Sequence, residues 1–150
     1  MRLLTGLTIG AWTTVGNAAL TSNFPAGSTA SGMSGDRLPN STRVSGSLSL
    51  DQEFRVRSSL TGSVGSSVSY VGRRLGEFGS TGAPERQIYP AYTKVDLRTT
   101  LEYEAWRASF YINNVTDKRA AMAGGIGSFQ NSQFFYIQPR TYGLSVSRAF

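Results

Sequence analysis

Large apolar side chains alternate with small or polar ones along most of this chain, with a period of two residues. In the last ten residues, TYGLSVSRAF, the large side chains are Tyr142, Leu144, Val146, Arg148 and Phe150. Such alternation is typical of β-strands with one apolar and one polar face, whereas helical periodicity is almost absent. The pattern therefore predicts an all-β fold.

The alternation recurs in six segments, each of which predicts a strand. These segments are residues 4–15, 42–54, 59–72, 92–104, 106–115 and 141–150. Long segments rich in Gly, Ser, Asn or Pro occupy residues 16–41, 74–91 and 117–138, whereas 55–58 and 104–105 are short turns. We therefore expect an antiparallel up-and-down meander with short turns at one end and long loops at the other.

The two faces of this meander differ in chemistry, because one is apolar and the other mixes charged residues with Ser, Gly and Thr. Together with the unequal connections, this is typical of outer-membrane β-barrels, in which the polar face lines a water-filled lumen. A soluble β-sandwich alternates in the same way and packs its apolar face on a second sheet, so this alternative stays open. The side chains expected to face the lumen are Arg43, Asp51, Glu53, Lys94, Asp96, Arg98, Glu102 and Arg107.

Aromatic residues of the apolar face gather beside the short turns. Phe54, Tyr103 and Trp106 hold such positions, and Phe150 should fall at the same end, since six antiparallel strands return the chain there. Aromatic side chains form girdles at membrane interfaces, which predicts an interfacial role for these residues. Arg148 is then a cation on the lipid face, at a depth where it costs only about 0–1 kcal/mol.

Composition narrows the chemistry that the chain can perform. The 150 residues contain no Cys and no His, which removes disulfides, thiol chemistry, zinc fingers and His-dependent triads. The carboxylate pairs Asp51–Glu53 and Asp96–Glu102 share strand faces with Arg or Lys, so ion pairing is the simpler account of them. We expect no enzymatic activity and no cofactor.

Charge and short motifs add little toward a ligand. The net charge is +6, but the basic residues are scattered, so nucleic acid is not an expected partner. The triplet NVT at 114–116 is expected to form a strand-end turn rather than a glycosylation site, and GGIGS at 124–128 a flexible loop rather than a phosphate cradle. Aromatic residues of the third long loop could contact a ligand or pack on neighbouring loops, namely Phe129, Phe134, Phe135 and Tyr136.

Four segments, in their order and spacing, give the chain a family likeness. The segments are DRLPNSTRVSGSLSL (36–50), YPAYTKVDLRTTLEYEAW (89–106), YINNVTDKRA (111–120) and IQPRTYGLSVSRAF (137–150). With them the chain resembles the C-terminal end of the barrel of TonB-dependent outer-membrane receptors, the active transporters of iron–siderophore complexes and similar nutrients. Thr42 stands where the family's first motif has a second Pro, and Val115 where its third motif has Leu.

The resemblance implies the outer membrane of a Gram-negative bacterium, with membrane lipid and the barrel-assembly machinery as partners. It implies that the closing strand, through Tyr142, Leu144, Val146 and Phe150, carries the assembly signal. The family's barrel has twenty-two strands around an N-terminal plug, and it engages ligand and TonB only in full-length form. Six strands are too few to close even the smallest membrane barrel, which has eight. We therefore expect residues 1–150 to be a truncated or fragmentary part of such a barrel, without plug; the alternative function is a soluble, adhesin-like β-sandwich.

Overall fold

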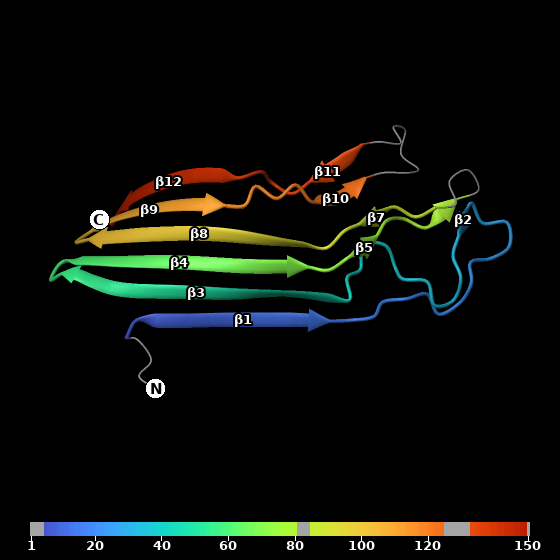
Figure 1. Ribbon diagram of the computed structural model, residues 1–150, viewed down its shortest axis with the longest axis horizontal. Coiled ribbons are helices and arrows are strands. Elements are labelled where there is room, and N and C mark those ends of the chain that lie inside the picture. The colour runs from blue at the N-terminus through green and yellow to red at the C-terminus, as the bar shows by residue number, and fades with distance from the viewer. Residues whose placement is uncertain (1–4, 81–84, 125–132, 150) are drawn as a thin grey trace.

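One antiparallel sheet dominates the computed structural model, which describes residues 5–80, 85–124 and 133–149 (Figure 1). The part described contains no helix, and the sheet has six strands in the order β1-β3-β4-β8-β9-β12. This confirms the predicted all-β fold and the six-stranded meander. The strands are β1 (Leu7–Val15), β3 (Val44–Arg57), β4 (Leu60–Val71), β8 (Tyr92–Tyr103), β9 (Trp106–Asn113) and β12 (Thr141–Arg148).

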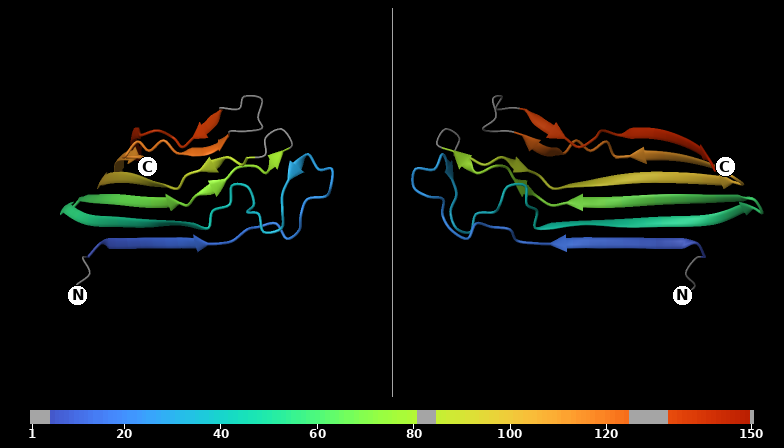
Figure 2. Two further views of the ribbon diagram at one scale, coloured as in Figure 1. Left: turned by 45° about the vertical axis from the view of Figure 1, so that its right-hand side comes forward. Right: turned by 180° about the vertical axis from the view of Figure 1, so that it is seen from behind.

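The connections are unequal, as the sequence predicts. The short β3–β4 and β8–β9 turns lie at one end of the sheet, where β1 also begins and β12 ends (Figures 1 and 2). The three long connections lie together at the opposite end (Figure 2). We call these the short-turn end and the long-loop end.

The strand register places most of the large apolar side chains on one face of the sheet, with Trp12 of β1 as an exception on the other face. Across neighbouring strands, Leu48 lies opposite Val68, and Leu97 lies opposite Ile112. Many of these side chains are exposed, up to 77% for Val15 on β1 and 72% for Leu144 on β12. The described residues supply no second layer over this face, because the buried apolar side chains that they contain lie outside the six strands.

The β3–β4 hairpin is longer than the sequence suggests. Residues 55–58 were expected to form the turn, but β3 continues to Arg57, and the turn comprises Ser58 and Ser59. A β-bulge between Arg55 and Arg57 inserts one extra residue, after which Arg57 lies opposite Leu60 on the apolar face. Because a bulge reverses the two-residue alternation, a periodic pattern cannot reveal it.

The long connections contain short strands that the sequence did not reveal. These short strands pair with one another in two-stranded sheets. Buried apolar side chains gather here rather than in the sheet, including Tyr89 and Ile137, which are 3% and 7% exposed. The pairs are β2 (Ala30–Ser31) with β6 (Gly79–Ser80), β5 (Arg74–Leu75) with β7 (Ile88–Tyr89), and β10 (Ala121–Gly124) with β11 (Phe134–Tyr136).

Candidate functional site

The polar face carries an ion pair that spans three strands. Arg98 Nη2 lies 2.6 Å from Asp51 Oδ2, so that β8 and β3 are bridged across β4. Gly65 lies between the two residues in the register, and a Cβ atom at this position would overlap the Asp51 carboxylate. The absence of a side chain at Gly65 thus leaves the space in which the pair forms.

Two further ion pairs follow the same face. Lys94 Nζ lies 2.8 Å from Asp96 Oδ2 on β8, and Arg107 Nη2 lies 2.6 Å from Glu102 Oε1 across the β8–β9 hairpin. The ion pairing expected from the sequence is therefore confirmed for these residues. Exposed pairs of this kind each contribute only about 0.2–1 kcal/mol, so they neutralise the face more than they hold it together.

The two remaining residues expected on this face are placed differently. Glu53 shares the face but forms no ion pair with any described side chain. Arg43 precedes β3 and is exposed at the long-loop end of that strand. Whether this face lines a lumen stays a prediction.

A shallow polar hollow lies in the middle of this face. It has a volume of about 180 Å³, and its lining includes Gly65, Asp96, Arg98 and Tyr111. The Tyr111 ring lies across Gly143 of β12, where a Cβ atom would overlap the ring. Glycines thus make room on this face both for an ion pair and for an aromatic ring.

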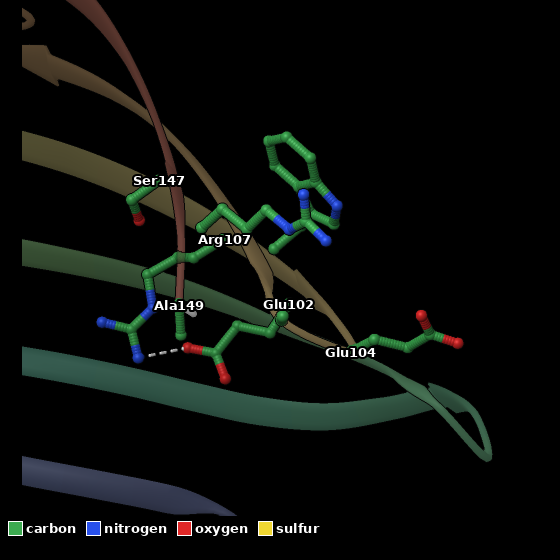
Figure 3. A pocket seen from close by; sticks show the side chains of 8 residues that line it. Glu102, Glu104, Arg107, Ser147 and Ala149 are labelled. Carbon is green, nitrogen blue, oxygen red and sulfur yellow. Dashed lines mark ion pairs between the residues drawn. The ribbon is translucent and has the colours of Figure 1, made fainter.

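A second hollow, of about 360 Å³, lies at the short-turn end. Figure 3 shows the Arg107–Glu102 ion pair beside it, with Ser147 of β12 and the following Ala149 close by. Glu104 points away from this pair at the tip of the hairpin (Figure 3). The charges that line the hollow therefore neutralise one another in part.

The aromatic residues expected at one membrane interface do share a face and an end of the sheet. Tyr103 lies opposite Trp106 at the β8–β9 turn, and the Phe54 ring covers Gly62 near the β3–β4 turn. All three side chains are between 43% and 50% exposed. Phe150 lies outside the described residues, and the interfacial role of the set stays a prediction.

Strand β12 alternates between the two faces of the sheet as its sequence predicts. Tyr142, Leu144 and Val146 lie on the apolar face and are 59%, 72% and 59% exposed. Arg148 shares this face, and its Cζ atom lies 5.3 Å from the centroid of the Trp106 ring. A cation–π contact with a neighbouring strand thus accommodates the arginine that appeared out of place in the sequence.

The aromatic residues of the third long loop belong to a strand, which corrects the expectation of an irregular loop. Phe134, Phe135 and Tyr136 form β11, and Phe135 and Tyr136 are 62% and 55% exposed. Phe129 lies outside the described residues. Residue Gly124 of the GGIGS motif ends β10, whereas residues 125–128 are likewise outside the described part.

Arginine and tyrosine side chains join the long loops. Arg74 donates to the carbonyl oxygens of Ala121 and Met122 at 2.9 and 3.3 Å, and the Tyr89 hydroxyl donates to Gly124 O at 2.5 Å. These contacts fix the β10–β11 hairpin to the preceding loop. Sequence reasoning missed both residues, since an arginine in a Gly-rich loop shows no period that identifies its partners.

Arg86 joins the first two long loops in the same way. It donates to Arg37 O at 2.7 Å and to Gly76 O at 2.8 Å, and its Cζ atom lies 4.4 Å from the centroid of the Phe78 ring. Burial lowers the pKa of Arg86, although the nearby carboxylates of Asp36 and Glu77 act in the opposite direction. The long-loop end is therefore a connected assembly.

The NVT turn is built around Asn114, the most completely buried polar residue that the structure describes, at 1% exposure. Its side-chain amide donates to the carbonyl oxygens of Lys118 and Gln138 at 3.0 and 2.9 Å, and its oxygen accepts from the Lys118 amide at 2.9 Å. The φ of Asn114 is 53°, which lies in the left-handed region rather than the strand region, so β9 ends just before this residue. The predicted strand-end turn is confirmed, and it connects β9 to the start of β12.

Asp117 completes this turn and gives it a pH dependence. The hydrogen bond from the Arg140 backbone amide, followed by that from the Arg119 side chain, lowers the pKa of Asp117 below its ordinary value of 3.8. A carboxyl whose pKa is lower in the folded state stabilises the fold above its unfolded pKa, and this contribution is lost as the pH falls through the folded pKa.

We therefore expect wild-type stability to decline at acid pH more steeply than that of Asp117→Asn. The asparagine keeps an oxygen for the Arg140 amide but carries no titrating group. Free energies of unfolding measured between about pH 2 and pH 5 check this difference. Parallel curves for the two proteins over this range would contradict the assigned role of the carboxylate.

Metal and membrane-helix features are not found in the part of the chain that the structure covers. Among the described residues, no group of three or more His, Cys, Asp and Glu side chains could hold a metal ion. No helix within the same residues is long and apolar enough to cross a membrane. A scan against protein-family models, a search of curated proteins and a search of solved structures each found no match.

Proposed function

We propose that this sheet is a segment of the wall of a transmembrane β-barrel, with its apolar face toward lipid and its polar face toward the lumen. The observation that carries the proposal is the apolar face itself, which continues across all six strands and is not covered by any other described residue. Soluble monomers rarely expose apolar patches larger than a few hundred Å². If the apolar face contacts the hydrocarbon core of a bilayer, it is no longer exposed to water.

The length of the apolar face fits this surrounding. On β8 the face extends from Thr93 to Tyr103, which is about 34 Å at roughly 3.4 Å per residue. Barrel strands tilt by about 35–45°, so the projected height is about 26 Å, close to the roughly 25 Å apolar band of such barrels. The sheet therefore has the length that a bilayer requires.

The edges of the sheet imply that more strands complete the wall. Within the described chain, β1 and β12 each have a neighbour on one side only. Hydrocarbon does not tolerate unpaired backbone groups, so spanning sheets close into barrels, and these have at least eight strands. We infer that both edges pair with further strands.

The motifs in residues 36–150 favour one family for this barrel. We propose that the chain forms the C-terminal strands of a TonB-dependent receptor in the outer membrane of a Gram-negative bacterium. In the full-length context this receptor takes up iron–siderophore complexes or similar nutrients with energy from TonB. The assembly signal is assigned to the closing strand, Phe150 included, and ligand contacts to the exposed aromatics of β11.

Fractionation of cells that express the native protein tests the proposal. The chain should be recovered with the outer membrane and require detergent for release. Recovery in the soluble fraction without detergent would contradict it and would favour the soluble, adhesin-like β-sandwich.

A further inference from the structure

A row of side chains crosses the apolar face at the short-turn end. Successive pairs in the register join Arg57 to Leu60, Leu60 to Tyr103, Tyr103 to Trp106, and Trp106 to Arg148. The row thus extends from β3 to β12, with an arginine at each end. We call these five residues the rim row.

The rim row holds the charges of the apolar face. Among the paired positions on this face of the sheet, only Arg57 and Arg148 are charged. The acidic residues nearby are directed elsewhere, since Glu53 and Glu102 lie on the polar face and Glu104 points outward from the turn (Figure 3). The rim of the apolar face is therefore basic.

The surroundings of the two arginines suit a headgroup phosphate. The Arg57 side chain is exposed and forms no hydrogen bond or ion pair with any described group, while Leu60 and the exposed Val56 lie beside it. Arg148 lies over Trp106, which holds its positive charge at the same level of the sheet. A planar guanidinium matches the geometry of phosphate oxygens, and aromatic rings prefer the level of the headgroups.

We propose that the rim row binds anionic glycerophospholipids of the leaflet at the short-turn end, with Arg57 as the principal phosphate contact. The inference rests on the proposed function, since it requires the apolar face to contact lipid. Short turns lie on the periplasmic side of outer-membrane barrels, so the leaflet concerned is the periplasmic one. A basic residue at a membrane surface contributes about a fivefold preference for anionic lipid.

Fluorescence of a single tryptophan at position 60, the register partner of Arg57, reports which lipid lies beside this arginine. The full chain with Leu60→Trp, Trp12→Phe and Trp106→Phe is reconstituted into vesicles of phosphatidylcholine and phosphatidylglycerol in equal amounts, with brominated acyl chains on one lipid or the other. Bromine quenches only nearby tryptophan, so the two quenching efficiencies give the lipid composition at the site. We expect brominated phosphatidylglycerol to quench more strongly.

Variants in the same background locate the preference. Arg57→Gln should lower the enrichment of phosphatidylglycerol about fivefold, whereas Arg57→Lys should retain most of it. Arg43→Gln is the matched control, because it removes the same charge beside the opposite end of β3 and should leave the enrichment unchanged.

The outcomes separate the two proposals. In the background that retains Arg57, equal quenching by both brominated lipids would overturn the headgroup site. The barrel proposal would still stand. An equal loss of enrichment in Arg43→Gln and Arg57→Gln would also overturn it, since the effect would be one of overall charge. Quenching by neither lipid would overturn the lipid-facing sheet and the headgroup site with it.

Discussion

Leu97→Arg should destabilise the bilayer-inserted chain by about 2–4 kcal/mol, the cost of an arginine at the lipid-facing midplane of a barrel. Leu97 lies on the apolar face of β8, midway between Tyr103 at the short-turn end and the start of the strand at Tyr92. From that depth the guanidinium reaches neither headgroup region without distorting the bilayer. Denaturant titration of the chain in neutral phosphatidylcholine vesicles measures the loss.

Ser67→Arg is the matched control for this substitution. Ser67 lies on the polar face of β4, opposite Asp96 and one register step from the Ser66–Leu97 pair. An arginine there enters the lumen of the proposed barrel beside a carboxylate, so a change within about 0.5 kcal/mol is expected. Similar losses in both variants would show that the two faces meet the same solvent, and the proposed barrel would be rejected.

Asn114→Ala should cost about 2–4 kcal/mol, because it removes three side-chain hydrogen bonds at a buried site and leaves their backbone partners without replacement. Alanine also disfavours the left-handed φ of 53° at this position. The loss should appear where β9 passes into the turn, with faster hydrogen exchange at the Lys118 amide. Chemical denaturation in lipid or detergent measures the total loss in the free energy of unfolding.

Asn114→Gly separates the two causes. Glycine adopts a left-handed φ without strain but supplies none of the three hydrogen bonds. We expect it to recover only the smaller, conformational part of the loss. If glycine restored wild-type stability, the buried hydrogen bonds would not be what holds this turn.

The sheet could be predicted from the sequence because the alternation of apolar and polar residues that defines its strands is local and periodic. The parity of Val95, Leu97 and Leu101 against Lys94 and Asp96 assigns each residue of β8 to a face, and the register agrees. The short turns and long loops then give the order of the strands. Such inferences need only the two-residue repeat of an extended chain.

Features that depend on contacts distant in sequence could not be predicted in this way. The bulge that turns Arg57 to the apolar face breaks the repeat on which the interpretation depends. Arg74 and Arg86 bond to carbonyl oxygens of other loops, and nothing in the adjacent sequence identifies these partners. The short strand pairs within the long connections were missed for the same reason.

The candidate site could likewise be predicted only where the pattern of the sequence is local. That Arg148 lies on the apolar face followed from parity, but its contact with Trp106 requires knowledge of the β9–β12 register. Asn114 could be recognised as a turn residue, whereas its bond to the distant Gln138 carbonyl could not. The space that Gly65 leaves for Asp51 and Arg98 likewise appears only when three strands are aligned.

The two outer strands of the sheet have a consequence for the order of assembly. Roughly half of the backbone amides and carbonyls of β1 and β12 point outward from the sheet, and each such group costs several kcal/mol if it enters hydrocarbon unpaired. The sheet therefore cannot insert first and find its neighbours afterwards. Strand pairing at both edges must precede, or accompany, the passage of this segment into the membrane.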